Sequence, residues 1–395
     1  MENLLNKYAD KLVAQGLVDP PGPLIGGLDA DIMWNRPDRR QVLLEKVVAG
    51  LDVAAILFAR PAEPYFSLIN RLADRIPVGQ HILCPQDNEN RTFLHELPVV
   101  DDPSAANLIR VLKKRKCAII PGQGVISYGT VSPEQAYIVF SSVCFSLFVK
   151  AFVDFFDDLR AGRRDALLAE LVMQGKTYYQ TCLEAAGSHP VLMQGPFESG
   201  KEAVQAICEV GRLTVGKKMV DSFFGNISYR LGNTVYISQT TSSLDELEGC
   251  IDPCALDDSR CTAITASSEY PAHKSVYRNS GHRAILHGHP RFSVIASLLC
   301  DQRETCTDRN DCHTKCKQKR FAGSVPIIPG ESGTGPHSIA ATLPAPLIRF
   351  KTAIIYGHGV FTTGRCDFRD AFKRLLEVEQ VSFNAYFEHI QKLQR

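Results

Sequence analysis

The chain lacks an excess of charge of either sign. Its 44 Lys and Arg residues are balanced by 43 Asp and Glu residues, which leaves a net charge of +1 at pH 7. A protein that binds nucleic acid or an anionic membrane through charge needs a strongly basic surface. The balance therefore argues against both as main partners, whereas the 45% apolar and 22% charged content is ordinary for a globular protein.

The chain also lacks a leader-like start and an uninterrupted apolar run. Residues 1–7 contain no basic segment followed by an apolar one, so we expect no secretory signal and predict a cytoplasmic protein. The most apolar stretch, Tyr137 to Phe156, includes Lys150 and Asp154. These charges favour a buried helix over a membrane span.

Cysteine, in contrast, is plentiful, with 13 residues. In a reducing compartment this number indicates free thiols or metal ligands and not a disulfide framework. Four of them lie close together in a segment that is rich in charge and poor in apolar residues: Cys300, Cys306, Cys312 and Cys316, with His313 among them. They could close a structural metal site, although the spacings are unusual for one; exposed loop thiols are the alternative.

Two histidines follow an apolar segment at alternating positions. Residues 284–286 are Ala-Ile-Leu, and His287 and His289 come next. In a strand, side chains two residues apart point to the same face. The pattern therefore predicts a strand that presents two imidazoles to one metal ion, with ordinary surface histidines as the alternative.

A second apolar segment, residues 353–356, is followed by a histidine that stands between two glycines. Gly357 and Gly359 allow a tight turn and a close approach of the backbone, so that His358 can point into the same site. Glu269 stands at the expected start of a helix over 270–278 and supplies a carboxylate. Three neutral imidazoles leave one position of a tetrahedral Zn²⁺ open, which is typical of a catalytic site.

Five short motifs, in this order, carry a resemblance to a known family. They are Phe224-Gly-Asn-Ile-Ser228, Ile237-Ser-Gln-Thr-Thr241, Ser267-Ser-Glu269, His287-Gly-His289 and Gly357-His-Gly359. The region from about residue 205 to 390 resembles the class II aldolase/adducin family, which includes fuculose-phosphate aldolase. The resemblance implies that Zn²⁺, or another divalent metal such as Mn²⁺, Co²⁺ or Fe²⁺, binds His287, His289 and His358.

The same resemblance implies a substrate site. In similar aldolases, the matching positions hold the phosphate of the substrate, and here they are Asn226, Thr240, Thr241, Ser267 and Ser268. From the residues alone, these small donors and turns are equally typical of ordinary loops. The family often has Thr-Gly where this chain has Thr240-Thr241, which puts a phosphate in doubt. His273, four residues after Glu269, is expected to pack or to support the site.

The N-terminal half contains weakened copies of these motifs. Residues 118–125 share six of eight residues with residues 353–360, at an offset of 235. Residues 55–61 share Ala, Ile, Leu and Pro with the segment that carries His287, at an offset of 229. These two matches predict a duplicated domain.

The predicted N-terminal copy has lost the metal ligands. Phe58, Arg60 and Gln123 stand where the other copy has its three histidines. A third match, Leu17-Val-Asp19 with Met219-Val-Asp221, has an offset of 202. The smaller offset places a gap of about 27 residues in the N-terminal copy, opposite residues 240–268.

We therefore expect an α/β protein in which a three-layer α/β/α sandwich with a mostly antiparallel central sheet occurs twice. The predicted domains are a degenerate one over 1–160, a helical connector and linker over 161–200, and a metal-binding one over 201–395. Related single domains form four-fold rings. A homodimer of this chain would mimic such a ring of four domains.

The function expected from the resemblance is zinc-dependent aldol cleavage or condensation of a small sugar phosphate or related keto compound. The metal would stabilise the enediolate as a Lewis acid, and Glu269 would move the proton. Alternatives in the family are a dehydratase, an epimerase and a decarboxylase. The epimerases carry Asp at the position of Glu269. An adducin-like interaction module is the non-catalytic alternative, but such domains lack the metal histidines.

Overall fold

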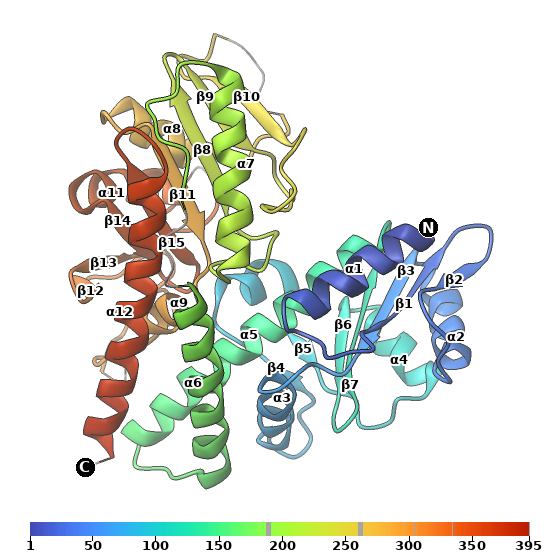
Figure 1. Ribbon diagram of the computed structural model, residues 1–395. Helices are drawn as coiled ribbons and strands as arrows, with labels where there is room; N and C mark the ends of the chain where they lie inside the picture. The colour runs from blue at the N-terminus through green and yellow to red at the C-terminus, as the bar shows by residue number, and fades with distance from the viewer. Residues whose placement is uncertain (187–190, 260–263, 304, 334, 395) are drawn as a thin grey trace. The chain divides into compact units, whose positions relative to one another are not determined.

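The computed structural model describes residues 1–186, 191–259, 264–303, 305–333 and 335–394 (Figure 1). This part of the chain divides into two compact units, Met1–Tyr179 and Gln180–Arg395. The division falls inside the predicted connector over 161–200. Residues 187–190 of that connector lie outside the described residues, and the helix expected over 161–186 is α6 (Ala166–Ala186).

The first unit is built on a five-stranded antiparallel sheet with the order β2-β1-β3-β7-β6. Its strands are β1 (Leu24–Leu28), β2 (Ile32–Trp34), β3 (Ala55–Ala59), β6 (Cys117–Ile120) and β7 (Gly124–Gly129), with a separate hairpin of β4 (Ile82–Leu83) and β5 (Leu97–Pro98). The helices are α1 (Glu2–Ala14), α2 (Gln41–Leu51), α3 (Tyr65–Asp74), α4 (Ala105–Leu112) and α5 (Pro133–Arg160), with the π-helix η1 (Asn90–Leu94).

Helices cover the sheet of this unit, and apolar side chains of the strands pack against them. Ile56, Ala118 and Ile126 pack with residues of α2 and α4 in one buried cluster, while α1 and α5 also contact the sheet. Helix α5 is long and apolar enough to cross a membrane by length and composition, but most of its apolar window is buried. The prediction of a buried helix over residues 137–156 is confirmed.

The second unit has an eight-stranded sheet with the order β10-β9-β8-β11-β15-β14-β13-β12. Its strands are β8 (Asn226–Leu231), β9 (Thr234–Ser238), β10 (Ile251–Ala255), β11 (Ala284–Gly288), β12 (Arg320–Ala322), β13 (Val325–Ile328), β14 (Thr352–Ile355) and β15 (Gly359–Gly364). Among the described strands of this sheet, β13 and β14 pair in parallel and the other pairs are antiparallel. The sheet is therefore mostly antiparallel, as the sequence predicted.

Six helices surround this sheet: α7 (Gly200–Gly216), α8 (Tyr270–Arg278), α9 (Arg291–Leu298), α10 (Ile339–Thr342), α11 (Pro344–Phe350) and α12 (Arg369–Leu393). The α7 helix begins at a capping box, in which Ser199 and Glu202 satisfy each other's backbone N–H groups. Residues of α8, α10 and α11 share one buried cluster with Ile285, Ala353 and Phe361 of the strands. Other contacts join α7, α9 and α12 to the same sheet (Figure 1).

Candidate active site

The three predicted histidines meet at one end of the central strands of the second unit. His287 lies in β11, His289 follows that strand, and His358 lies in the turn between β14 and β15. One ring nitrogen from each histidine lies within 4.8 Å of the others, and all three side chains are buried. Among the described residues, this is the group of His, Cys, Asp or Glu side chains with the geometry to hold a metal ion.

The imidazoles are prepared to act as neutral ligands. His287 Nδ1 lies 3.1 Å from the Val360 carbonyl oxygen, which can only accept a hydrogen bond. Its proton therefore sits on Nδ1, and the lone pair of Nε2 faces His289 Nε2 at 3.2 Å. Burial lowers the pKa of both His287 and His289, because the charged forms would lose their hydration.

Glu269 joins this group from the N-terminus of α8. Its Oε2 lies 3.5 Å from His287 Nε2, and its Oε1 lies 3.4 Å from His358 Nε2. Burial works to raise the pKa of Glu269, but its attraction to His287 and His358 in their protonated forms, together with the hydrogen bond from the Asn226 amide, outweighs burial, and the net shift is downward. The carboxyl group is therefore ionised at neutral pH.

The Asn226 amide orients this carboxylate. Asn226 lies opposite His287 in the pairing of β8 with β11, and its Nδ2 donates a hydrogen bond of 2.6 Å to Glu269 Oε2. The Asn226 Oδ1 is buried and accepts no hydrogen bond among the described residues. The sequence predicted Asn226 as a phosphate contact; the contact with Glu269 was missed, because 43 residues separate the two.

Two glycines bring the backbone of the last histidine close to the other two, as their spacing predicted. Gly357 has a φ of 64°, which favours glycine. A Cβ on Gly359 would lie 2.4 Å from the Gly288 carbonyl oxygen and less than 3 Å from carbon atoms of the His289 and His287 rings. Ser297 Oγ accepts a hydrogen bond of 2.8 Å from the Gly357 N–H and fixes the turn.

His273 lies behind the site and not in it. Its Nδ1 is 2.7 Å from Ser228 Oγ, and its ring meets the edge of Phe361. The other contact of Phe361 is a stack against His287, with ring centroids 3.9 Å apart. Burial lowers the pKa of His273 to about 3, so this imidazole is neutral and supports the ring that positions His287.

Apart from Asn226, which lies in β8, the predicted phosphate residues lie in two adjacent loops. One follows β9 and contains Thr240 and Thr241; the other precedes α8 and contains Ser267 and Ser268. The loops are joined by hydrogen bonds from Ser267 N to the Ser238 carbonyl and from Thr240 N to the Thr265 carbonyl. Ser267 is buried, with its Oγ accepting from Glu269 N, whereas Thr240, Thr241 and Ser268 are exposed.

Thr241 has an unusual backbone conformation. Its φ is 59°, in the left-handed region that a β-branched residue rarely adopts. Thr241 therefore adopts a backbone conformation that glycine adopts most easily. Strain of this kind persists where the surrounding structure holds it, and it is common at functional sites.

The cysteine-rich loop lies between α9 and β12. Cys300, Cys306, Cys312 and Cys316 are half-buried free thiols, and the thiols of the described part of the chain form no group with metal-ligand distances. Burial raises the pKa of Cys312, and Cys316, Cys300 and Cys306 raise it further. A second metal on these residues stays a prediction.

Support from the C-terminal helix was also missed. Glu379 of α12 is fully buried and accepts hydrogen bonds of 2.7 Å from the backbone N–H groups of Phe292 and Ser293. These groups belong to the first turn of α9, just beyond His289. A carboxylate stabilises the N-terminus of a helix, but no sequence signal links residues that lie 87 positions apart.

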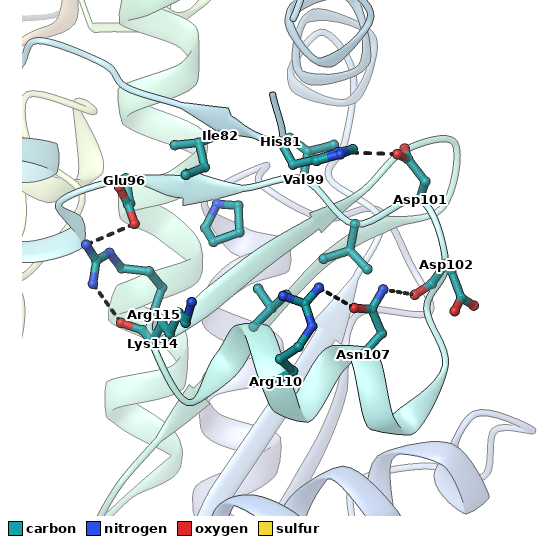
Figure 2. Close-up of a pocket in the computed structure, with 13 residues that line it drawn as sticks. His81, Ile82, Glu96, Val99, Asp101, Asp102, Asn107, Arg110, Lys114 and Arg115 are labelled. Atoms are coloured by element: carbon teal, nitrogen blue, oxygen red, sulfur yellow. Dashed lines mark hydrogen bonds and ion pairs between the residues drawn. The ribbon is translucent and has the colours of Figure 1, made fainter. Parts of the chain in front are cut away.

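A cavity of about 410 Å³ lies elsewhere, in the first unit (Figure 2). Its floor is apolar, with Val99 and Val100, and its rim carries ion pairs between Arg115 and Glu96 and between His81 and Asp101. None of the predicted site residues lines this cavity. The lining also carries charged side chains of both signs, among them Asp102, Arg110 and Lys114, so the cavity suggests no ligand class.

Comparison with known families gives one match. Residues 205–385 match the family described as class II aldolase and adducin N-terminal domain. This region is a little less than half of the chain. A search of curated proteins found no match.

Solved structures resemble about half of the chain at low sequence identity. The l-fuculose-1-phosphate aldolase from Thermus thermophilus is 18% identical over 49% of this chain and 97% of its own, with a TM-score of 0.38. The sugar-phosphate aldolase from Thermotoga maritima is 17% identical over 49% and 97%, with a TM-score of 0.35. YgbL from Klebsiella pneumoniae, described as an aldolase, epimerase or decarboxylase, is 20% identical over 48% and 91%, with a TM-score of 0.39.

Proposed function

We propose that the second unit is a metal-dependent lyase, because residues 205–385 match the class II aldolase and adducin family. It would cleave or form a carbon–carbon bond in a small sugar phosphate or a related keto compound. The observation that carries this proposal is the buried group of three imidazoles with the carboxylate of Glu269 beside it.

The residues of this group fit a divalent metal. His287, His289 and His358 offer three ring nitrogens in a buried setting, and no cationic side chain is part of the group. A neutral set of three imidazoles is suited to Zn²⁺, and also to Mn²⁺, Co²⁺ or Fe²⁺. When bound, such a cation would act as a Lewis acid toward the carbonyl oxygen of the substrate.

Glu269 would move the proton. It is ionised and buried, and it lies 3.4–3.5 Å from two of the three imidazoles, so a substrate held at the histidines would meet its carboxylate. In cleavage, the ionised carboxylate would take the proton of the hydroxyl on the carbon that becomes the aldehyde and give it to the other carbon after the bond breaks; in the reverse reaction, it would remove a proton from that carbon and return it to the new hydroxyl. The Asn226 amide would hold the carboxylate in place, and its Oδ1 could accept a hydrogen bond from a substrate hydroxyl.

The phosphate contacts remain part of the proposal. Thr240, Thr241 and Ser268 are exposed in two loops joined by backbone hydrogen bonds, close in sequence to Asn226 and Glu269. Their hydroxyl groups and the left-handed Thr241 backbone are consistent with a bound phosphate. The alternatives are a dehydratase, an epimerase or a decarboxylase that uses the same metal group, or a non-catalytic adducin-like module.

We also propose that the first unit is a degenerate copy of the second, with both built as three-layer α/β/α sandwiches. The strand order β2-β1-β3-β7-β6 corresponds to β9-β8-β11-β15-β14. Phe58 pairs with Leu24 and Ile126, while His287 pairs with Asn226 and Phe361. These pairs differ by the same offsets of 202, 229 and 235 that the sequence matches have.

Close contacts of glycines support this duplication independently. A Cβ on Gly124 would lie 2.3 Å from the Ala59 carbonyl oxygen, as one on Gly359 would lie 2.4 Å from that of Gly288. Within its described residues, the first unit has no strand that corresponds to β10 (Ile251–Ala255). That strand falls within the 27 residues that the N-terminal copy is expected to lack.

Assembly and location complete the proposal. Four such domains in two chains could close a ring like that of related single domains, because closed symmetry needs only that equivalent surfaces meet. We therefore propose a homodimer. A cytoplasmic location is supported by the free thiols, since oxidising compartments favour disulfides.

Metal content and turnover test the proposal together. The purified protein should hold one divalent metal per histidine site, and His289→Ala should lose it with the fold retained. His337→Ala, which removes an exposed histidine of the same unit, should change nothing. Wild-type protein loaded with Zn²⁺ should cleave at least one member of a panel of ketose 1-phosphates and non-phosphorylated 2-keto acids. Full metal content in a variant that lacks all three histidines would overturn the proposal.

A further inference from the structure

The end of the first sheet that corresponds to the metal site carries arginines instead of ligands. At the offset of 229, Arg60 stands at the position of His289, and Arg40 stands at that of Glu269. Each of Arg40 and Glu269 immediately precedes its helix, α2 or α8. Arg36 and Arg39 lie in the same loop as Arg40.

Two of these guanidinium groups lie over aromatic rings. The Arg40 guanidinium carbon lies 4.7 Å from the centre of the Phe58 ring, and that of Arg60 lies 3.6 Å from the centre of the Phe66 ring. Stacking fixes the plane of a guanidinium and leaves N–H groups at its edge to donate. The two groups are therefore oriented before any ligand arrives.

The side chains lie at one end of the sheet. Phe58 and Arg60 are two residues apart at the end of β3, and Ala59 pairs with Val125 of β7. A Cβ on Gly124 would lie 3.1 Å from Arg60 N, so the backbone of Gly124, which directly follows Gln123, lies close to that of Arg60. Gln123 is exposed and adds an amide at the position of His358.

The charge of this group is strongly positive. Asp38 is the carboxylate within it and accepts hydrogen bonds from Arg36 Nη1 at 3.0 Å and Arg40 Nη1 at 3.4 Å. Among the described residues, Arg39 and Arg60 have no carboxylate partner, and the nearby Glu63 accepts a hydrogen bond from Ser67 N instead. Four arginines and one aspartate leave a net charge of +3.

We propose that Arg40, Arg60 and Gln123, with Arg36 and Arg39 beside them, bind a small oxyanion of the phosphate class. In the second unit, three imidazoles and a carboxylate suit a cation; here, guanidinium groups at the same positions suit an anion, which they can bind through paired N–H donors. The N-terminus of α2 adds a favourable dipole. The site would hold either inorganic phosphate or the phosphate group of a sugar phosphate.

The proposed duplication serves to identify these positions, but the contacts of Arg40 and Arg60 exist without it. The inference therefore does not depend on metal binding or turnover in the second unit. A failure of the lyase proposal would leave it intact. Its own failure would leave the lyase proposal intact.

Calorimetric titration of the full-length protein with inorganic phosphate tests the inference. The double variant Arg40→Ala/Arg60→Ala should weaken binding by at least about 10-fold, since hydrogen bonds to charged groups are the stronger class. Arg60→Lys should lose less, because it keeps the charge. Arg349→Ala is the matched control, because that exposed arginine also stacks on a phenylalanine, Phe350; it should bind as the wild type does.

Three outcomes decide the question. An unchanged unfolding temperature without phosphate would show that the double variant is folded, and weaker binding would then support the site. Equal affinity in the double variant and the wild type, or no binding of phosphate to the wild type at millimolar concentration, would overturn it. Binding that is lost in Thr241→Ala/Ser268→Ala and kept in the arginine variant would assign the anion to the second unit. A ketose 1-phosphate titrated in parallel distinguishes free phosphate from a sugar phosphate as the tighter ligand.

Discussion

At the scale of single residues, one carboxylate combines properties that are usually separate. Glu269 is buried, yet the imidazoles and the Asn226 amide keep its pKa low. An ionised carboxylate that has little contact with water interacts strongly with nearby charges and polar groups, and its burial costs folding free energy. Its position 3.4–3.5 Å from two imidazoles therefore indicates a functional role and not a contribution to folding stability.

Replacing Glu269 by Gln should separate proton transfer from metal binding. The amide keeps the shape and one acceptor oxygen but cannot exchange a proton, so turnover should fall by about 10²-fold or more. Metal content, measured by atomic emission, should stay at the wild-type value. Undiminished turnover would remove Glu269 from the reaction.

At the scale of elements, the turn between β14 and β15 delivers the third imidazole. Its glycines allow close packing that no other residue permits, because the backbone of β11 and two histidine rings occupy the space around Gly359. The same turn geometry in the first unit, at Gly124, has no metal ligands around it. Substitutions in the two turns can therefore separate an effect on folding stability from an effect on metal binding.

Gly359→Ala should lower metal affinity by more than about 10-fold, since the added methyl group would displace His287 and His289 from their shared centre. Gly281→Ala, where a Cβ meets open space, should have no effect. Gly124→Ala should lower the unfolding temperature and leave the metal content unchanged. Competition with a chromophoric chelator would measure the affinities, and a wild-type affinity in Gly359→Ala would contradict the assigned geometry.

A buried acid next to η1 and α5 should make stability depend on pH. Asp87 is fully buried, and burial raises its pKa to about 6 despite hydrogen bonds from Ser146 Oγ and Asn90 N. A raised folded-state pKa means that the folded protein holds the proton more tightly than the unfolded chain. Ionisation therefore costs stability, and this cost appears as the pH rises from about 4 through 6.

Asp87→Asn should remove this cost. The free energy of unfolding of the variant should exceed that of the wild type by about 1–3 kcal/mol at pH 7.5, and by clearly less at pH 5. Urea denaturation at both values measures the difference. Asp10→Asn, at an exposed carboxylate of the same unit, should show no such trend. An equal increase in the free energy of unfolding at both pH values would show that the increase comes from packing and not from ionisation of Asp87.

At the scale of the whole molecule, the five strands of the first sheet follow the order of five neighbouring strands in the second sheet. In the proposed duplication, the second unit has three histidines and a carboxylate where the first has Phe58, Arg60, Gln123 and Arg40. A unit that has lost its metal ligands would be retained if it supplies a surface to a catalytic neighbour. The proposed ring provides such a role.

Light scattering should therefore give a mass of twice the 43.7 kDa chain. A dimer of this kind should hold two histidine-bound metal ions, one per chain. Residues 200–395 expressed alone should bind zinc and turn over poorly, or reassemble into tetramers. A monomeric full-length protein, together with a fully active monomeric second unit, would contradict the proposed assembly.

Much of the site was determined by the sequence alone, because its ligands lie in short, regular segments. The period of two residues in a strand put His287 and His289 on one face, and the glycines on both sides of His358 indicated a close turn. Periodicity and the run of apolar residues also predicted the buried helix over residues 137–156. Repeated motifs also predicted a duplicated domain, and the proposed alignment of the two halves rests on them.

Only the tertiary structure decided which distant residues share a contact. Strand register joined Asn226 to Glu269, and helix packing brought Glu379 to the first turn of α9. The four loop cysteines, close in sequence, do not gather at metal-ligand distances among the described residues. Local patterns depend on the few residues around them, whereas these contacts depend on how strands pair and helices pack across about 40 to 90 positions. Short sequence patterns therefore predicted the candidate ligands, and only the fold showed which residues contact them.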